Sequence, residues 1–251
     1  MNEDFDQKTY LITGASHGVG QAICAILTGR GDHVVSLSRT APALRDGSCD
    51  HRWTECDLAD AGCMAHVVTE LDEEALPVMD GVFLNAARAV YGKVADLPTD
   101  ELEAIFRVNL FSQVEMLSKL RHRLSPGARV VYISTSASRI PAPQMGAYAA
   151  SKLALEGVLQ SMCMEEGWNL SILRPAEIDT EFARKSGVPD TFDAGFSKLD
   201  PGVVARKAVA CLDSGKVFAN VGLRAKIIDA VVRIYPQWLM KRRPKTALKT
   251  R

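Results

Sequence analysis

Two side chains with complementary chemistry, Tyr148 and Lys152, stand four positions apart in the segment Tyr148-Ala-Ala-Ser-Lys152. On a helix this spacing places both on one face, so that a phenol and an ammonium can reach the same site. A phenol has an ordinary pKa of about 10, too high for easy proton exchange at neutral pH. A neighbouring cation stabilises the phenolate and lowers that pKa, which makes the tyrosine a usable general acid or base. Taken alone, a tyrosine and a lysine at this spacing usually lie on the solvent-exposed face of a helix.

A second candidate site is the run Thr13-Gly-Ala-Ser-His-Gly-Val-Gly20, whose glycines are separated by three residues and then by one. Glycines let the backbone approach a pyrophosphate, and the N-terminus of a following helix supplies N–H donors and positive potential. Glycine also serves ordinary tight turns. The position of this run directly after a strand-like segment favours cofactor binding. The expected contacts are Gly14, Ser16, His17, Gly18, Val19 and Gly20.

The elements that must position these groups follow from the alternation of short β-rich runs with stretches at helical spacing. The expected strands are 10–12, 33–37, 53–56, 81–85, 129–134, 170–173 and 216–221. The expected helices are 19–27, 65–71, one from about 99 to 110, 148–165, 201–212 and 223–234. The alternation predicts an α/β fold with a parallel sheet and right-handed crossovers. We expect one doubly wound domain over 1–251, with helices on both faces and a core over about 8–221.

The segment 178–199 lacks clear periodicity and mixes glycine and proline with three phenylalanines. A long irregular segment inside a compact domain is often a binding loop or a lid. We therefore expect it to cover a substrate site, with a plain surface loop as the alternative.

The composition is that of an ordinary globular protein, with 47% hydrophobic and 24% charged residues. Lysine plus arginine and aspartate plus glutamate both total 30, so no overall field favours nucleic acid as a partner. The first seven residues include three acids and no basic region, which argues against a secretory signal. No apolar run approaches the roughly 20 residues that span a bilayer. These features predict a cytoplasmic protein.

Six cysteines are present, at positions 24, 49, 56, 63, 163 and 211. They include no Cys-x-x-Cys pair and no histidine at a spacing typical of metal sites. We therefore expect no metal site, and we expect most of them to be small core residues with free thiols, as in a reducing cytoplasm.

The glycine pattern and the Tyr-x-x-x-Lys pattern together resemble the short-chain dehydrogenase/reductase family, in its shorter-chain branch. The resemblance covers roughly 8–212 and implies a Rossmann domain and a nicotinamide cofactor. In relatives, the tyrosine exchanges a proton with the substrate oxygen while nicotinamide moves the hydride, a role that falls to Tyr148. The lysine holds the nicotinamide ribose and tunes the tyrosine, a role that falls to Lys152.

The resemblance implies two further catalytic residues. Asn109, in the pair Val-Asn, matches the asparagine that supports a water-linked proton relay. A hydroxyl residue that polarises the substrate carbonyl lies most often thirteen positions before the tyrosine, which here is Thr135. Ser134 and Ser136 flank it and are the alternatives.

Other cofactor contacts are implied in the same way. Relatives contact the adenine with a pair that matches Asp57 and Leu58, and the nicotinamide carboxamide with residues that match Ile178 and Thr180. Two departures replace glycine by alanine, at Ala87 and Ala176. The full set of implied contacts outside the glycine turn is Arg39, Asp57, Leu58, Asn85, Ala86, Tyr148, Lys152, Pro175, Ile178 and Thr180.

The choice between NADP(H) and NAD(H) can be argued from the end of the second expected strand. A carboxylate there would accept hydrogen bonds from the adenosine ribose, as in NAD enzymes. This chain has Ser38 followed by Arg39, whose guanidinium can pair with a 2′-phosphate. His17 is a second candidate for that phosphate. We therefore expect NADP(H) to be preferred, with a solvated charge as the alternative interpretation of Arg39.

The end of the chain, 223–251, is atypical of the family: a helical stretch is followed by six basic residues and no acid between 241 and 251. We expect an apolar helix face packed on the domain or on a partner subunit, with a solvated basic tail. Peripheral membrane contact by this segment is the less favoured alternative. Family behaviour implies a homodimer or a homotetramer.

The leading hypothesis is an NADPH-dependent carbonyl reductase, or the reverse alcohol dehydrogenase, acting on a small-molecule substrate. The alternatives are an NADP-binding regulatory or sensor protein and a membrane-associated lipid or sterol reductase. The four residues suited to proton transfer disfavour a sensor, because a sensor has no need of them: Asn109, Thr135, Tyr148 and Lys152.

Overall fold

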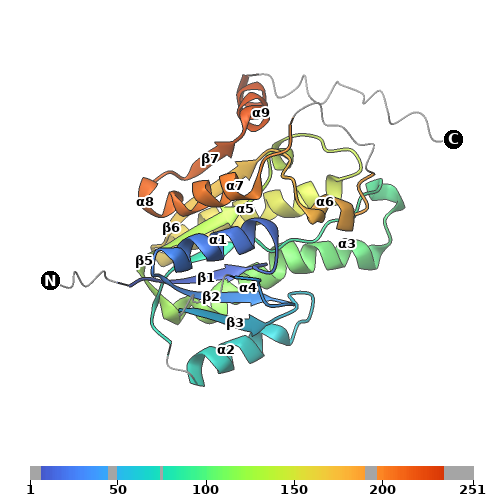
Figure 1. The fold of residues 1–251 in the computed structure, drawn as a ribbon. Helices are drawn as coiled ribbons and strands as arrows, with labels where there is room; N and C mark the ends of the chain where they lie inside the picture. Colours follow the sequence, from blue (N-terminus) through green and yellow to red (C-terminus); the bar gives the residue numbers. More distant parts are fainter. Residues whose placement is uncertain (1–6, 45–49, 74–75, 190–196, 235–251) are drawn as a thin grey trace.

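The computed structural model describes residues 7–44, 50–73, 76–189 and 197–234, which build a seven-stranded sheet between helices (Figure 1). Every neighbouring pair of strands is parallel, in the order β3-β2-β1-β4-β5-β6-β7. The strands are β1 (Thr9–Thr13), β2 (His33–Ser38), β3 (His51–Glu55), β4 (Met79–Leu84), β5 (Leu124–Ile133), β6 (Asn169–Pro175) and β7 (Phe218–Val221). The predicted doubly wound fold class is confirmed.

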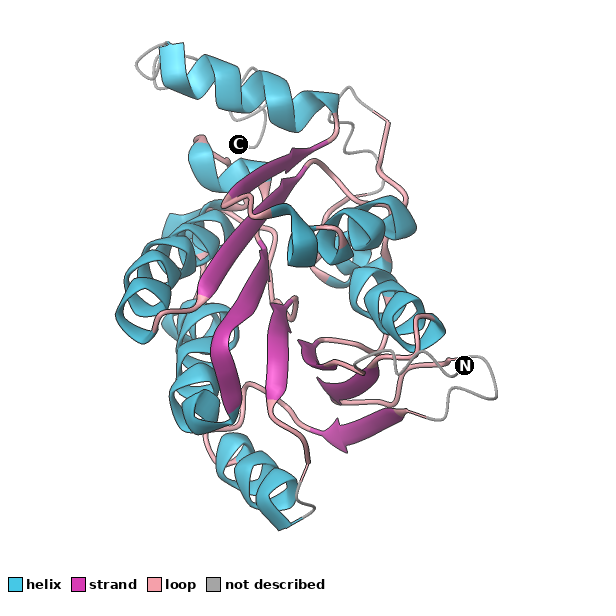
Figure 2. Ribbon diagram, turned by 90° about the vertical axis from the view of Figure 1, so that its left-hand side faces the viewer, coloured by secondary structure: helices cyan, strands magenta, loops and turns pink. Residues whose placement is uncertain are grey.

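The helices lie on both faces of the sheet, as the view in Figure 2 shows. One core layer joins the sheet to α1 (Gly18–Gly29) and α7 (Pro201–Val209), and the opposite layer joins it to α2 (Cys63–Glu73), α4 (Ser112–Leu120) and α5 (Gly146–Glu166). Successive residues of β1 serve opposite layers: Leu11 enters one, and Tyr10 and Ile12 enter the other. Burial on both faces explains why the strand sequences are almost continuously apolar.

The strand order reverses between β1 and β4, because the chain builds outward first in one direction and then in the other. In an open parallel sheet, ligands bind outside the carboxyl ends of the strands at this switch point. The glycine turn follows β1, and the segments after β4, β5 and β6 begin at the same edge of the sheet. This edge therefore collects the candidate site residues.

Three elements differ from the sequence prediction. The expected helix 201–212 is divided into α7 and α8 (Cys211–Ser214). β5 begins at Leu124 instead of 129, because Leu124 pairs with Met79 and Arg129 pairs with Gly81, which leaves a bulge on β5. The expected single helix from 99 is divided into α3 (Thr99–Phe106), a π-helical segment (Arg107–Phe111) and α4.

The segment 178–199 is partly described. It contains a short helix, α6 (Glu181–Lys185), and a parallel bridge between Ile178 and Leu199. Two of its three phenylalanines, Phe192 and Phe196, lie outside the described residues.

The predicted C-terminal helix is confirmed as α9 (Leu223–Ile234), and α8 (Cys211–Ser214) precedes β7. Asp229 of α9 pairs with Arg139 at 3.7 Å, which ties the helix to the segment after β5. Ile227 and Ile234 of α9 are exposed in the single chain, so these two residues do not pack on the domain, and packing on a partner subunit stays a prediction. The basic tail lies outside the described residues, and none of the described helices is long and apolar enough to cross a membrane.

Candidate active site

The glycine turn lies against the segment that follows β4. Gly14 has a φ of +68°, and a Cβ placed there would lie 2.8 Å from the Cα of Ala86. The side-chain amide of Asn85 donates to the carbonyl oxygen of Gly14 at 2.9 Å. The hydroxyl of Thr13 accepts the backbone N–H groups of Asn85 and Ala86, both at 3.1 Å. Asn85 and Ala86 therefore support the turn, and only glycine fits at position 14.

The turn leads into the N-terminus of α1, where no side chain caps the exposed N–H groups. Such a terminus offers donors and positive potential to a phosphate. Thr180 lies over it, because a Cβ added to Gly18 would sit 3.1 Å from the Thr180 methyl group. Ser16 is half-buried and His17 exposed, whereas the side chain of Val19 is buried in the core, so only its backbone faces the turn.

The end of β2 carries the two residues on which the cofactor argument depends. Ser38 is buried, and its hydroxyl donates to the carbonyl oxygen of Thr40 at 2.8 Å. Its own carbonyl accepts from the Trp53 indole at 3.1 Å. Arg39 follows and is exposed, with no carboxylate in the adjoining position.

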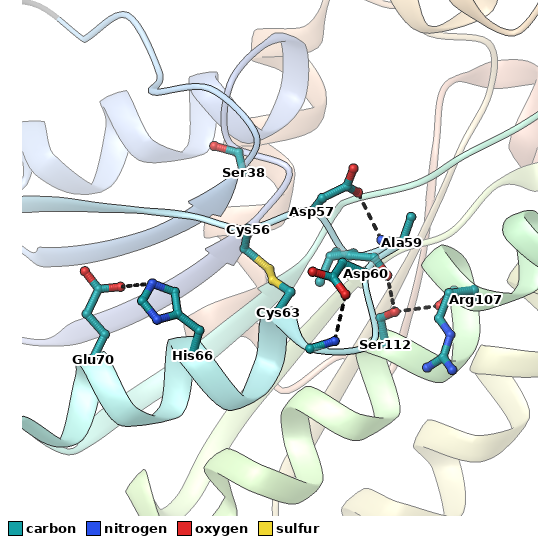
Figure 3. The surroundings of a disulfide bond; sticks show 12 residues. Ser38, Cys56, Asp57, Ala59, Asp60, Cys63, His66, Glu70, Arg107 and Ser112 are labelled. Carbon is teal, nitrogen blue, oxygen red and sulfur yellow. Dashed lines mark hydrogen bonds and ion pairs between the residues drawn. A yellow bond between two sulfur atoms is a disulfide. The ribbon is translucent and has the colours of Figure 1, made fainter.

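A disulfide between Cys56 and Cys63 closes the loop that contains Asp57 and Leu58 (Figure 3). The expectation of free thiols is wrong for this pair. The loop after β3 turns back so that α2 begins beside the end of β3, and the two Cα atoms lie 5.6 Å apart. A separation of seven residues matches no familiar motif, so the sequence offered no signal for it.

The loop holds its two predicted adenine contacts in different ways. The carboxylate of Asp57 is exposed and accepts from the N–H of Ala59 at 3.0 Å. Leu58 is buried, and its carbonyl accepts from the hydroxyl of Ser112 on α4 at 2.5 Å. Three other cysteines are free and buried, as predicted: Cys24, Cys163 and Cys211. Cys49 lies outside the described residues.

We expect reduction of the disulfide to lower the free energy of unfolding by about 2 to 3 kcal/mol, because opening a short closed loop increases the freedom of the unfolded chain. Urea unfolding with and without dithiothreitol measures the change. The double variant Cys56→Ser/Cys63→Ser is the control, since reductant should not alter its unfolding curve. A wild-type curve insensitive to reductant would contradict the expectation.

Tyr148 and Lys152 of α5 lie together, as their spacing predicts, with Lys152 buried and Tyr148 half-buried. The Nζ atom of Lys152 is 5.9 Å from the centroid of the Tyr148 ring and 4.9 Å from that of Tyr132. It donates to the carbonyl oxygen of Ile133, at the end of β5, at 2.9 Å. The phenol and the ammonium therefore share one site at the carboxyl edge of the sheet.

The electrostatics of this pair differ from the sequence expectation. Burial lowers the pKa of Lys152 to about 7, although the carboxylate of Glu156 opposes the shift. Burial raises the pKa of Tyr148 above its ordinary value, so the expected lowering by the lysine is not seen in the protein alone. The physical reason is that burial disfavours the charged phenolate relative to the neutral phenol.

Of the three candidate hydroxyls after β5, Thr135 is half-exposed and the two serines are buried. The Thr135 side chain accepts from the N–H of Ala137 at 3.2 Å. Ser134 donates to Glu156, away from this edge, at 2.5 Å. The geometry thus leaves Thr135 with the better access to a substrate.

Asn109 is buried in the π-helical segment, and both ends of its amide are engaged. Its oxygen accepts from the Arg88 N–H at 2.7 Å, and its nitrogen donates to the Arg88 carbonyl at 2.8 Å and to Ser151 at 2.9 Å. The Ser151 hydroxyl in turn donates to the Tyr148 carbonyl at 2.8 Å. Asn109 therefore connects the segment after β4 to the first turn of α5. Single π-turns often mark functional sites.

The segment after β6 completes the edge. Pro175 ends the strand, and the N–H of Ala176 donates to Val221 of β7 at 3.0 Å. Phe182 of α6 packs against Tyr148, with 5.6 Å between ring centroids. The aromatic content of this segment was the only sequence signal for that contact.

Tyr91 and Gln144 join the loop after β4 to the segment before α5, a contact that sequence reasoning missed. The Tyr91 hydroxyl donates to the side-chain oxygen of Gln144, and the Gly92 N–H donates to its carbonyl at 2.8 Å. Gln144 has a φ of +65°, which is rare for a residue with a side chain. No local pattern predicts this conformation, because it depends on contacts with a distant loop.

Comparison with known proteins agrees with this geometry. The cyclic-di-GMP-binding biofilm dispersal mediator protein of Escherichia coli K12 is 27% identical over 184 residues, which are 70% of this chain and 76% of that protein. The uncharacterized oxidoreductase YbbO of the same strain is 30% identical over 182 residues, 70% of this chain and 68% of that protein.

A short-chain dehydrogenase from Burkholderia cenocepacia, solved in complex with NADP, superposes with a TM-score of 0.79 at 20% identity and covers 93% of this chain and 95% of its own. The family model for short chain dehydrogenases matches residues 8–189. The chain therefore belongs to the short-chain dehydrogenase family, whose members are oxidoreductases that bind nicotinamide cofactors.

Proposed function

We propose that this protein is an NADPH-dependent carbonyl reductase, or an alcohol dehydrogenase in the reverse direction, with Tyr148 as general acid and base. The observation that carries the proposal is the placement of Lys152. Its Nζ atom is held by the end of β5 at 2.9 Å and faces the Tyr148 ring, at the edge where the glycine turn ends. A solvated helix face would leave both side chains in water, whereas Lys152 is 1% exposed.

The chain has a cradle that fits a dinucleotide. Side chains at Gly14 or Gly20 would collide with neighbouring backbone, so the turn presents bare N–H groups to a pyrophosphate. Thr180 lies beside the turn, where the carboxamide would rest. The bound cofactor supplies the hydride.

The residues of the chain would divide the remaining work of reduction. Thr135 donates a hydrogen bond to the carbonyl oxygen of the substrate and polarises it. Tyr148 donates its proton to that oxygen as negative charge develops. Lys152, in its charged form, stabilises the phenolate that remains. Asn109 would support a water-linked relay that returns a proton to Tyr148.

The preference for NADPH rests on Arg39 and on the absence of a carboxylate in the adjoining position. A guanidinium at the end of β2 can bind a phosphate bidentately, and neither residue beside Arg39 in the sequence is acidic. That the similar Burkholderia structure holds NADP is consistent with this choice.

Absorbance loss on mixing the purified protein with NADPH and a panel of ketones, aldehydes and imines tests the proposal. We expect at least one carbonyl compound to accelerate NADPH oxidation well above the rate without substrate. Tight NADPH binding without turnover on any member of the panel would contradict it.

A nucleotide-binding regulatory protein is the second candidate, favoured by the similarity to a cyclic-di-GMP-binding mediator protein. Calorimetric titration with cyclic-di-GMP distinguishes the two. A regulatory protein should bind it and turn over no carbonyl compound, whereas a reductase should show carbonyl-dependent NADPH oxidation whether or not cyclic-di-GMP binds.

We further propose that the protein forms a homodimer through α4 and α5. A groove between these helices is lined by Leu110, Phe111, Val114 and Val158 among others. Phe111 is 54% exposed and Val158 of α5 is 37% exposed. An exposed apolar surface of this kind is typical of a protein interface.

We expect Phe111→Glu to convert the dimer into monomers, because it replaces buried apolar contact by a carboxylate that must lose its hydration. Size-exclusion chromatography with light scattering measures the mass. Val78→Glu is the control, since Val78 is equally exposed but lies before β4, away from the groove. A Phe111→Glu protein of dimeric mass would place the interface elsewhere.

A further inference from the structure

A buried ion pair lies directly behind the candidate active site. Glu156 of α5 and Arg174 of β6 have side chains that are 2% and 6% exposed. Their closest atoms, Nη2 and Oε2, are 2.5 Å apart, and the Arg174 Nε lies 3.1 Å from both carboxylate oxygens. The guanidinium also lies 4.5 Å from the ring centroid of Phe218 on β7. Buried charges are costly unless they are paired and hydrogen-bonded, and this pair is both.

The carboxylate of Glu156 also holds the segment that carries Thr135. Oε1 accepts from the hydroxyl of Ser134 at 2.5 Å and lies 3.0 Å from the hydroxyl of Ser138. The Ser138 hydroxyl lies 2.8 Å from the carbonyl oxygen of Thr135 as well, so its single proton serves one acceptor at a time. Thr135 therefore lies in the sequence between two serines, Ser134 and Ser138, whose hydroxyls both contact the buried carboxylate of Glu156.

Glu156 follows Lys152 by one helical turn on the same buried side of α5. The groups that face Lys152 are the rings of Tyr132 and Tyr148, the carbonyl of Ile133 and the charge of Glu156. The groups that face Glu156 are Arg174, Ser134 and Ser138, together with Lys152 and the uncharged phenol of Tyr132. The carboxylate raises the pKa of Lys152 against the effect of burial.

We propose that Glu156 and Arg174 form a positioning pair for the active site: Arg174 fixes the Glu156 carboxylate, which anchors the Thr135 segment through Ser134 and Ser138 and holds a negative charge one helical turn from Lys152. The inference rests on the proposed function, because it assigns these residues to the same reaction. Neither side chain is placed to touch substrate or cofactor, so both act through Thr135 and Lys152.

The variant Glu156→Gln keeps the shape and removes the charge. We expect kcat to fall roughly 10- to 100-fold, as small misplacements of reacting groups do, with the Kd for NADPH changed less than about threefold. Without the carboxylate, the pKa of Lys152 should fall further below 7, so that alcohol oxidation requires more alkaline pH. The control Glu70→Gln removes a carboxylate that pairs at 2.6 Å with Arg52 of the edge strand β3. It should leave kcat and the pH profile unchanged.

A purely structural pair would lower the melting temperature and leave the pH profile and kcat of the folded protein as in the wild type, which would overturn the proposal. If Glu156→Gln does not fold, Ser138→Ala tests the same link by removing one hydroxyl. It should lower kcat about tenfold at constant cofactor Kd and leave the Lys152 titration unaltered. An unchanged kcat in Ser138→Ala would also count against the proposal.

Titration of Lys152 by NMR of ¹³C-labelled lysine separates this inference from the proposed function, because it needs no turnover. Lys152→Arg identifies the signal. A lower Lys152 pKa in Glu156→Gln supports the electrostatic role even if no carbonyl compound is reduced by the wild type. An unchanged Lys152 pKa refutes that role even if the wild type proves an active reductase.

Discussion

Tyr148→Phe should lower kcat by about 10²- to 10⁴-fold, the range that a positioned general acid or base contributes. The substitution removes only the hydroxyl, and the remaining ring can still pack against Phe182, at 5.6 Å between centroids. The fold and the glycine turn are untouched, so the Kd for NADPH should change by less than about threefold. Single-turnover NADPH oxidation and fluorescence titration measure the two quantities.

The matched control is Tyr91→Phe, which removes a hydroxyl that donates to Gln144 in the segment before α5. We expect it to leave kcat within a few-fold of the wild type, because the ring that faces Lys152 beside the proposed reaction is that of Tyr148. A Tyr148→Phe protein that turns over at the wild-type rate would refute the assignment of the general acid. A large loss of NADPH affinity would instead give Tyr148 a binding role.

The sequence was sufficient wherever function and fold depend on local pattern. The spacing of Tyr148 and Lys152 defines one side of a helix, and the structure brings the two side chains together, with Lys152 buried and Tyr148 half-buried. The alternation of strands and helices predicted the parallel sheet, whose topology brings the glycine turn and the segment of Thr135 to one edge. Even the atypical α9 was predicted with its bounds, since its periodicity is local.

The features that were missed depend on contacts between residues distant in the chain. The disulfide at Cys56 depends on how the loop returns to β3, which no spacing rule encodes. The Glu156–Arg174 pair joins a helix to a strand, and in sequence each residue resembles an ordinary surface charge. Burial also reversed the expected pKa shift of Tyr148, because a buried site disfavours the charged phenolate.

Arg39→Asp should reverse the preference between the two cofactors. The guanidinium is expected to form charge-assisted hydrogen bonds with the 2′-phosphate, worth about 3 kcal/mol together, which corresponds to roughly 100-fold in affinity. The new carboxylate would also repel that phosphate and accept hydrogen bonds from the ribose hydroxyls of NADH. The ratio of kcat/KM for NADPH to that for NADH should therefore fall by about 100-fold or more.

Arg121→Asp is the control, because Arg121 is an exposed arginine before the start of β5, at the opposite edge of the sheet. It makes the same change in net charge, so a general electrostatic effect on the anionic cofactors would appear in both variants. His17→Ala tests the second candidate for the phosphate and should lower the ratio by a smaller factor than Arg39→Asp. If Arg39→Asp leaves the ratio at its wild-type value, the 2′-phosphate does not bind at the end of β2, and the preference must be set by other residues of the adenosine site.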